Sequence, residues 1–387
     1  MSRKLISYLE LYEAYLECRV HKRNTINALS FELDLETNLL DLLNDINNRT
    51  YVIGRSVSFI VNKPVKREIF AADFRDRIVH HLVINKINWI FEKMFIRDSY
   101  SCRKNKGTSY AINRLTHFMR SCSQNYSSPC YVLRLDIQGF FMHINRELLW
   151  FKVKKTIEEN YNKLDKDTIL YLCKLIIENN PTINCLIKGS KSEWKGLPKN
   201  KSLFHSNKGC GLPIGNLTSQ VFANLYLNDF DHFAKKTLGL RYYGRYVDDF
   251  FVIHSDKSFL KELIPKFRNF LAGKLGLTLH PNKVYLQSVE KGILYLGVWI
   301  YPYNKTVHSR NVENLRLNLI SWNKCVEGKK PTRDEVEKFL SSINSYFGYL
   351  RTYNSYKLRR KAFYKWMSGY WLNIVNSSGG FAKLRIK

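Results

Sequence analysis

The sequence predicts a mixed α/β (α+β) fold, with helices at both ends of the chain and strands in the middle. Residues 1–50 place apolar side chains such as Leu9, Tyr12 and Leu16 on one helical stripe. Short apolar or alternating segments then indicate strands at 51–53, 57–61 and 68–70, and the last third returns to helical spacing. With 387 residues, the chain has room for two or three packed units.

Two helix starts can be placed from their capping residues. Asp73 can cap a long helix whose apolar positions are Ile78, Leu82, Ile87, Phe91 and Met94. Near the C-terminus, Thr332 and Glu335 fit a capping box. The helix that follows them is expected to bury one stripe, made of Val336, Phe339, Leu340, Ile343, Phe347 and Leu350.

The charge balance indicates a polyanionic partner. Lys and Arg total 62 against 33 acidic residues, which gives a net charge of +29 at pH 7. Aromatic residues make up 14% of the chain and offer surfaces on which bases can stack. A basic protein without a nucleic-acid partner is the alternative.

Membrane attachment and export are not expected. No apolar run approaches the roughly 20 residues that span a bilayer. The first residues soon turn acidic at Glu10 and Glu13, unlike a signal peptide. The eight cysteines form no Cys-x-x-Cys pair and have no histidine at zinc-finger spacing. We therefore expect reduced thiols, no zinc site and a cytoplasmic location.

Carboxylates interrupt two predicted strands. The segment 131–137 alternates like a half-buried strand and reaches Asp136 near its end. In the second segment, Asp248 and Asp249 stand inside the apolar run 245–253, which a tight hairpin at the two acids explains. Burying paired acids costs free energy unless a cation compensates them. Such a pair is a typical site for Mg²⁺, although an ordinary acidic turn is the alternative.

Five motifs in order resemble those of the reverse transcriptase family, over roughly residues 50–365. They are the strand ending at Asp136, the glycine turn Gly211–Gln220 with the helix after it, Tyr246-Val-Asp248-Asp249, Leu279–Lys283 and Leu294–Gly297. The resemblance implies a right-hand polymerase with fingers, palm and thumb. The expected divisions are residues 1–128 for an N-terminal helical segment and the fingers, 129–304 for a palm with a basic excursion at about 163–208, and 305–387 for a helical thumb and C-terminal tail.

The sequence of the glycine turn indicates which subgroup of reverse transcriptases the chain resembles. Group II intron enzymes usually have Gln-Gly and then Ser-Pro there, whereas this chain has Ile214-Gly215 and Ser219-Gln220. That variant is similar to the reverse transcriptases of diversity-generating retroelements, as are the segments 74–81, 98–108 and 346–357. Bacterial defence-associated reverse transcriptases, which work with a non-coding RNA, share much of this core. Both biological roles therefore stay open.

The resemblance implies RNA-directed DNA synthesis with two Mg²⁺ ions, for which Mn²⁺ is a possible substitute. Asp136 and Asp248 would bridge both ions, with the Ile137 carbonyl as a neutral ligand. Asp249 would contribute to the field and the hairpin geometry, and direct ligation and a turn-stabilising role are both open for it. A catalytically inactive nucleic-acid-binding protein is a further alternative, and the intact Asp136, Asp248 and Asp249 argue against it.

The resemblance also implies nucleotide contacts. Lys63 and Arg67, with Lys66 as a register alternative, would bind the triphosphate. Lys283 would protonate pyrophosphate, with a solvated loop lysine as the alternative. The remaining expected nucleotide-binding residues are Phe141 as a steric gate against the ribose 2′-OH, Ile214 in place of the usual glutamine, and Gly215 and Gln220 in the glycine turn. Simple core packing is the alternative for Phe141 and Ile214.

The basic residues near the fingers and thumb are the expected nucleic-acid contacts. They are Arg103, Lys104, Lys106, Lys357, Arg359 and Arg360, with Lys361 beside the last. Plain solvent exposure is the alternative for each. The expected partners are a structured template RNA, a DNA or RNA primer, deoxynucleotides and, in a retroelement, a small basic accessory protein.

Overall fold

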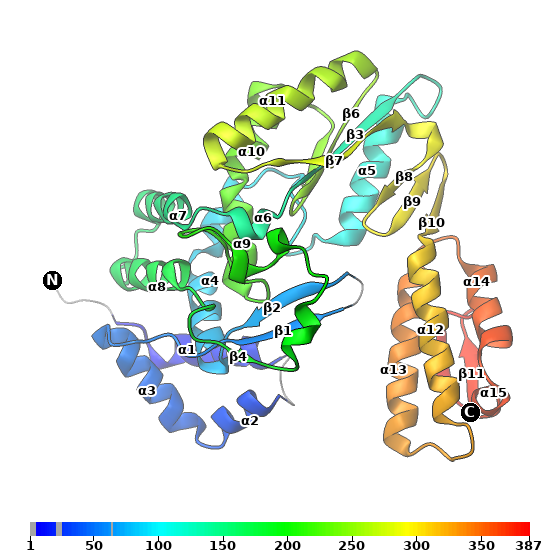
Figure 1. Cartoon of the computed structure of the whole chain (residues 1–387), viewed down its shortest axis with the longest axis horizontal. Coiled ribbons are helices and arrows are strands. Elements are labelled where there is room, and N and C mark those ends of the chain that lie inside the picture. The colour runs from blue at the N-terminus through cyan, green and yellow to red at the C-terminus, as the bar shows by residue number, and fades with distance from the viewer. Residues whose placement is uncertain (1–4, 21–24, 63–64) are drawn as a thin grey trace. The chain divides into compact units, whose positions relative to one another are not determined.

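The computed structural model describes residues 5–20, 25–62 and 65–387, which form two compact units (Figure 1). The first unit takes residues from 1–111, 133–252 and 258–285. The second takes residues from 112–132, 253–257 and 286–387. The chain therefore crosses between the units several times, and the expected division into three consecutive parts stays a prediction.

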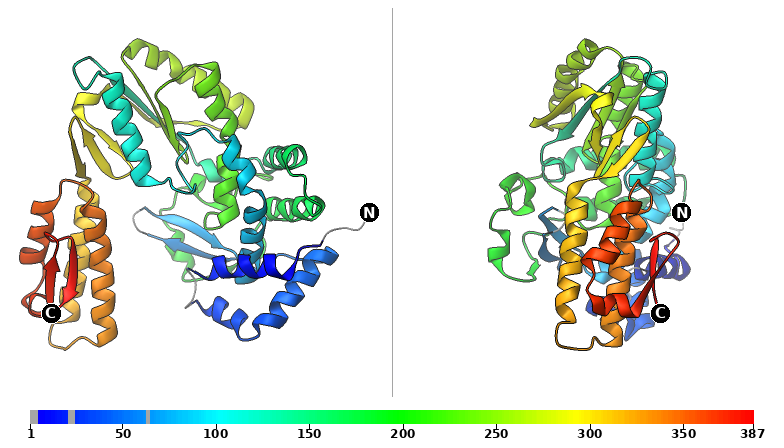
Figure 2. Two further views of the ribbon diagram at one scale, coloured as in Figure 1. Left: turned by 180° about the vertical axis from the view of Figure 1, so that it is seen from behind. Right: turned by 90° about the vertical axis from the view of Figure 1, so that its right-hand side faces the viewer.

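Helices of the first unit pack around the long helix α4 (Phe74–Met94). Its Asp73 cap is confirmed, because the Asp73 carboxylate accepts a hydrogen bond from the Arg75 amide at 3.0 Å. Helices α1 and α9 both pack against α4 (Figure 2). The other helices of this unit are α1 (Tyr8–Arg19), α2 (Ile26–Glu32), α3 (Leu35–Asn48), α6 (Phe140–His143), α7 (Arg146–Asn160), α8 (Lys166–Glu178), α9 (Leu217–Tyr226), α10 (Asn228–His232) and α11 (Lys257–Leu275).

A hairpin of β1 (Val57–Val61) and β2 (Arg67–Ala71) carries the first confirmed strands. The short strand β4 (Leu186–Ile187) pairs in parallel with β1, so part of the basic excursion extends this sheet. Glu68 fixes the excursion further: its buried carboxylate accepts hydrogen bonds from Trp194 Nε1 at 2.6 Å and Ser202 Oγ at 2.7 Å. The excursion is thus packed against the hairpin.

The expected strand at 51–53 is wrong. This segment has no regular secondary structure, and Tyr51 is buried as a single anchor whose hydroxyl donates to Asp76 Oδ1 at 2.7 Å. The amide of Gly54 donates to the other oxygen of Asp76 at 3.0 Å. The Tyr51 amide donates to the Asp45 carbonyl at 3.1 Å, and the Tyr51 carbonyl accepts from the Tyr171 hydroxyl at 3.2 Å, so the backbone has partners here without a strand.

A second sheet runs in the order β5-β6-β3-β7. Its strands are β5 (Tyr243–Tyr246), β6 (Asp249–His254), β3 (Tyr131–Ile137) and β7 (Leu279–Ser288). The expected hairpin is present, but its turn consists of Val247 and Asp248 rather than of the two acids, because Asp249 already pairs with Tyr246 as the first residue of β6. This order places β3 between β6 and β7, which brings three of the sequence motifs side by side.

The second unit contains the expected C-terminal helices and a small antiparallel sheet in the order β10-β9-β8. The capping box is confirmed, with the Thr332 hydroxyl accepting from the Glu335 amide at 3.2 Å. The elements are α5 (Thr108–Cys122), which begins in the first unit, β8 (Ile293–Tyr295), β9 (Val298–Tyr301), β10 (Asn304–Val307), α12 (Ser309–Cys325), α13 (Arg333–Leu350), α14 (Tyr356–Lys361), α15 (Gly369–Ile374), β11 (Val375–Ser378) and β12 (Lys383–Ile386).

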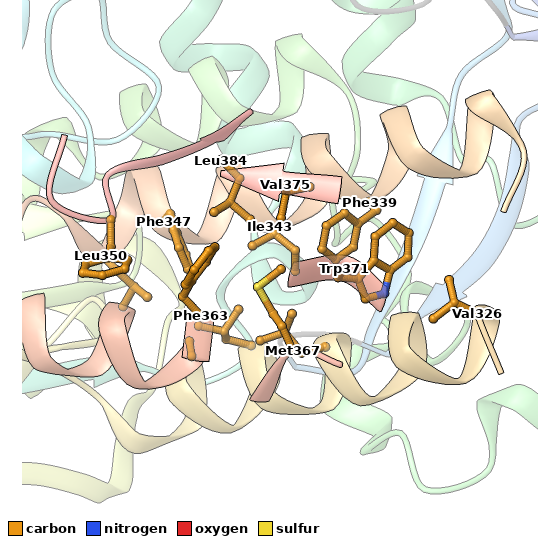
Figure 3. Packing of buried hydrophobic residues seen from close by; sticks show 14 residues of the cluster. Val326, Phe339, Ile343, Phe347, Leu350, Phe363, Met367, Trp371, Val375 and Leu384 are labelled. Atoms are coloured by element: carbon orange, nitrogen blue, oxygen red, sulfur yellow. The ribbon is translucent and has the colours of Figure 1, made fainter. Parts of the chain in front are cut away.

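One apolar core holds the C-terminal elements together (Figure 3). The Trp371 ring of α15 stacks on Phe339 of α13, with ring centroids 3.8 Å apart and planes 9° from parallel. Trp371 also donates its indole N–H to the Trp322 carbonyl on α12 at 3.1 Å. Phe339, Ile343, Phe347 and Leu350 are buried as the helical stripe predicted, whereas Val336 and Leu340 are only partly buried. In the described ranges, no helix is long and apolar enough to cross a membrane.

Candidate active site

The sheet of the first unit brings two predicted acids to one place. Asp136 comes from β3 and Asp248 from the β5–β6 turn, where its carbonyl accepts a hydrogen bond from the Ile137 amide at 3.2 Å. Burial raises the pKa of Asp248 to about 7, and the second cause is the negative charge of Asp136. Two carboxylates that repel each other in a desolvated turn form a site that a cation would stabilise.

Alternation along β3 places Arg134 and Asp136 on the same face of the strand. Arg134 donates two hydrogen bonds to the carboxylate of Asp249 on β6, from Nε to Oδ1 at 2.8 Å and from Nη2 to Oδ2 at 2.6 Å. On the other side, Lys283 Nζ of β7 donates to Asp136 Oδ2 at 2.9 Å. Positive and negative side chains therefore alternate across three neighbouring strands.

These contacts separate the roles of the three acids. Asp249 is held by Arg134, and its pKa is raised by burial against the opposing effect of that guanidinium. Direct coordination by Asp249 would have to replace a paired Arg–carboxylate contact. The arrangement therefore favours the field and hairpin role expected for Asp249, and leaves Asp136 and Asp248 as the carboxylates available to a metal ion.

Buried polar side chains stabilise the turn that holds Asp248. Val247 has a φ of +56°, a conformation that is strained for a β-branched residue. Its carbonyl accepts a hydrogen bond from Arg245 Nη1 at 2.9 Å. Arg245 is fully buried and forms an ion pair with the equally buried Asp231 at 2.7 Å. Tyr243 also donates to Asp231, at 2.6 Å.

Arg134, Asp231 and Arg245 were missed by the sequence reasoning. Arg134 stands two residues before Asp136, and the alternation of the strand was the signal that both side chains share a face. Arg245 interrupts a run of apolar residues in β5 and β6, which is a signal for a buried partner. Nothing in the local sequence identifies Asp231 as that partner, because it lies on α10.

The donor set fits a magnesium site of modest size. Among the described residues, no three His, Cys, Asp or Glu side chains gather as a ligand cluster. Mg²⁺ is usually held by one or two carboxylates together with substrate phosphates and waters. Asp136 and Asp248, with the Ile137 carbonyl as the expected backbone ligand, match that pattern, and Lys283 already places a positive charge beside Asp136.

Two of the expected nucleotide-binding residues pack on one buried cluster. Phe141 and Ile214 pack against one small cluster, made of Phe70, Met142 and Leu203. Gly215 has a φ of +125°, and a Cβ there would lie 2.9 Å from Ile69 Cγ2, so only glycine fits this turn. Gln220 is exposed on α9, where its side-chain oxygen accepts from Cys102 Sγ at 2.9 Å.

The basic residues expected to bind the triphosphate and pyrophosphate differ in their surroundings. Lys63 lies outside the described residues. Arg67 is exposed at the start of β2, where a phosphate can reach it. Its register alternative Lys66 donates to the Lys195 carbonyl at 2.7 Å. Lys283 lies in β7 rather than in a solvated loop, and its ammonium is directed to Asp136.

Two of the residues expected to contact nucleic acid instead form ion pairs and hydrogen bonds within the protein. Arg103 is nearly buried, pairs with Glu92 at 2.9 Å and donates to the Ile96 carbonyl at 2.6 Å. Arg359 is buried and donates to the Phe381 carbonyl at 2.6 Å. The structure favours a bracing role for both, because their donor groups are already used internally.

The remaining basic residues are more accessible. Lys104, Lys357, Arg360 and Lys361 are exposed. Lys106 donates to the Arg97 carbonyl at 2.7 Å, and burial followed by the charge of Arg103 lowers its pKa to about 8. The exposed residues keep their predicted role as nucleic-acid contacts.

Comparison with known proteins identifies the family. Residues 62–300 match the family model described as reverse transcriptase (RNA-dependent DNA polymerase). The chain belongs to the reverse transcriptase family. The match covers all five sequence motifs, including Asp136 and the Asp248–Asp249 turn.

A curated relative and a solved structure are also similar to this chain. Protein YkfC of Escherichia coli (strain K12) is 22% identical over 255 residues, which are 58% of this chain and 60% of the relative. The structure of apo telomerase from Candida tropicalis has a TM-score of 0.50 at 13% identity, over 80% of this chain and 57% of that one. The fold is that of a right-hand polymerase. The chain spans about three fifths of the length of these relatives.

Proposed function

We propose that the chain is an RNA-directed DNA polymerase that adds deoxynucleotides to a primer 3′-OH. The observation that carries this proposal is the juxtaposition of Asp136 and Asp248. They come from two motifs more than a hundred residues apart, yet the amide of Ile137, which follows Asp136, donates to the Asp248 carbonyl at 3.2 Å. Membership of the reverse transcriptase family supports the same reaction.

Asp136, Asp248 and the Ile137 carbonyl would hold two Mg²⁺ ions. When bound, these ions supply Lewis-acid stabilisation of the attacking and leaving oxygens. Arg134 keeps Asp249 in place beside the pair, and the Arg245–Val247 contact fixes the turn that presents Asp248. The acids are therefore held in position before a substrate arrives, which lowers the cost of reorganisation.

In the reaction, the primer 3′-OH loses its proton to water and its oxygen bonds to the α-phosphorus of the deoxynucleotide, while the bond to pyrophosphate breaks. Lys283 Nζ can give a proton to the departing pyrophosphate, since it lies beside Asp136. Arg67, with Lys63 or Lys66, would bind the triphosphate. Phe141 would face the sugar and exclude a ribose 2′-OH.

The biological role that we propose is error-prone cDNA synthesis in a diversity-generating retroelement. Support comes from the Ile214-Gly215 variant of the glycine turn, which packs an apolar side chain against the same buried cluster as Phe141. The partners would be a structured retroelement RNA, a primer and a small basic accessory protein. A role in phage defence would use the same acids and a different RNA.

Primer extension by the purified full chain tests the proposed activity. Asp136→Asn and Asp248→Asn should reduce deoxynucleotide incorporation to about 1% or less, because each removes charge needed to hold metal. Asn should preserve the fold at position 248, since burial already favours the neutral carboxyl there. RNA affinity should stay within about twofold, because phosphate contacts come from dispersed cations.

Asp41→Asn is the matched control, because Asp41 is an exposed acid on α3. It should extend primers like the wild type. Extension that persists in either active-site variant would contradict the metal assignment. A wild-type chain that binds RNA and extends no primer would instead favour the inactive nucleic-acid-binding alternative.

A further inference from the structure

Two adjoining cavities lie in the second unit, between α5 and the β9–β10 hairpin. Their volumes are about 490 and 520 Å³, within the usual range of ligand pockets. They share a wall formed by Thr116, Arg120 and Lys305. Both lie at the Tyr301–Asn304 end of β9, whereas the motif Leu294–Gly297 lies at its other end. The cavities are therefore separate from that motif.

The lining of these cavities favours an anion. Arg120 and Lys305 are positively charged, and no lining side chain is acidic. Arg120 is held by the Asn125 side-chain oxygen at 3.1 Å, and Lys305 by that of Asn113 at 2.8 Å. Neutral amides position both cations without cancelling their charge, so the shared wall suits a phosphate group.

The second cavity adds aromatic surface. Its lining includes the tyrosines 126, 301, 303 and 353. Tyr303 is 72% exposed at the hairpin turn, yet it is held by its hydroxyl, which donates to the Asn125 carbonyl at 2.7 Å, and by an edge contact with the Tyr126 ring at 4.8 Å. A fixed and exposed ring is a platform on which a base can stack at little entropic cost.

Polar side chains complete the lining of the second cavity. The side chains of Asn304 and Asn354 in the same lining offer both donors and acceptors, as the edges of a base require.

We propose that these cavities bind unpaired nucleotides of an RNA strand, with a base on Tyr303 and the adjoining phosphate on Arg120 and Lys305. The inference rests on the proposed use of an RNA template and extends it. The site would bind a single-stranded part of the partner RNA apart from the primer duplex. Aromatic stacking and cationic contacts of this kind tolerate many sequences.

Photocrosslinking of the full chain tests the site directly. The probe is a single-stranded oligouridylate RNA of about 12 nucleotides, a length that covers a typical single-strand site, with 4-thiouridine as the reactive base. Mass spectrometry of the Asp248→Asn variant should find the adduct on Tyr303 or Tyr126. This variant cannot extend primers if the proposed function is right, so the crosslink reports on binding alone.

Matched variants measure the contribution of each contact by fluorescence anisotropy. Tyr303→Ala and Lys305→Ala should weaken RNA binding about tenfold, whereas Tyr303→Phe, which keeps the ring, should bind within about twofold of wild type. Lys324→Ala, at an exposed lysine of α12 outside both cavities, is the control. Thermal melting checks that each variant is folded.

Three results would overturn the site. They are adducts that lie only outside the cavities, a folded Tyr303→Ala variant with wild-type affinity, and crosslinking by the matching DNA strand but not by RNA. A failure of the proposed polymerase function would give a different result: the wild type would then crosslink at Tyr303 and extend no primer. Extension of a fully paired primer–template by Tyr303→Ala should equal that of wild type.

Discussion

Arg245 donates a hydrogen bond from Nη1 to the Val247 carbonyl at 2.9 Å, and thereby supports the left-handed residue that precedes Asp248. Its partner Asp231 is as deeply buried as Arg245 itself. A buried arginine thus links the body of the first unit to the turn that presents an acid to the active site. The contact explains how the chain keeps a strained turn in one conformation.

Arg245→Met should therefore affect both stability and activity. It leaves the Asp231 carboxylate buried without its guanidinium, which should lower the free energy of unfolding by about 3–5 kcal/mol. Urea unfolding measures this loss, and primer extension measures the effect on the turn. The double variant Arg245→Met/Asp231→Asn should regain part of the stability but not the extension rate, because the Val247 carbonyl still lacks its donor. Full activity in the double variant would show that the Val247 contact is dispensable.

Lys283→Ala should lower two quantities, the incorporation rate and the Mg²⁺ requirement. Incorporation should fall about a hundredfold, in the range of a lost general acid. The Mg²⁺ concentration for half-maximal activity should also fall, because the ammonium 2.9 Å from Asp136 opposes a nearby cation. Titrating Mg²⁺ at saturating deoxynucleotide separates the two effects. Lys283→Arg keeps the charge and should retain the wild-type Mg²⁺ requirement, and a higher requirement in Lys283→Ala would refute the repulsion.

Ile214→Gln should lower misincorporation. The residue packs in the same cluster as Phe141, so an amide there can reach the nascent pair or its sugar. A gain of about 1.4 kcal/mol in differential transition-state binding changes misincorporation tenfold. The measurement is single-nucleotide misinsertion opposite each template base at matched activity, with the largest drop expected opposite adenine. Ile214→Met is the apolar control, and an error spectrum unchanged by Gln would assign Ile214 to packing alone.

His80 should make the protein less stable in mild acid. Burial lowers its pKa to about 3, far below the value near 6.5 of an unfolded chain. The unfolded state therefore binds the proton, so the contribution of His80 to stability is fully present above pH 6.5 and is lost by about 1.4 kcal/mol per pH unit below it. Burial raises the pKa of Asp248 to about 7 and that of Asp76 to about 6, which gives a slope of opposite sign, so the measured quantity is the difference between variant and wild type. Relative to wild type, His80→Leu should gain about 1.4 kcal/mol of urea-unfolding free energy per pH unit below pH 6.5. His205→Gln, at an exposed histidine, should leave the slope unchanged; an equally steep slope in His80→Leu would place the titration elsewhere.

The elements that carry the chemistry could be predicted because they follow local rules. The alternation before Asp136, the paired acids in an apolar run, and the caps at Asp73 and Thr332 each depend on neighbours along the chain. The strand predicted at 51–53 is wrong for the same reason: its composition suits a strand, and the distant Asp45, Tyr171 and Asp76 give its polar groups other partners.

Neighbouring residues are enough to predict which acids stand at the ends and turns of strands, and the order of the motifs can be read directly along the chain. Which charges meet depends on the folded arrangement. The strand order β5-β6-β3-β7 puts Arg134 against Asp249 and Lys283 against Asp136, and the packing of α10 under β5 gives Arg245 its partner. It also removed Arg103 and Arg359 from the accessible cations by burying them. The reason is physical: strand and helix patterns are set by nearby residues, whereas ion pairs and burial depend on which distant segments the fold places in contact.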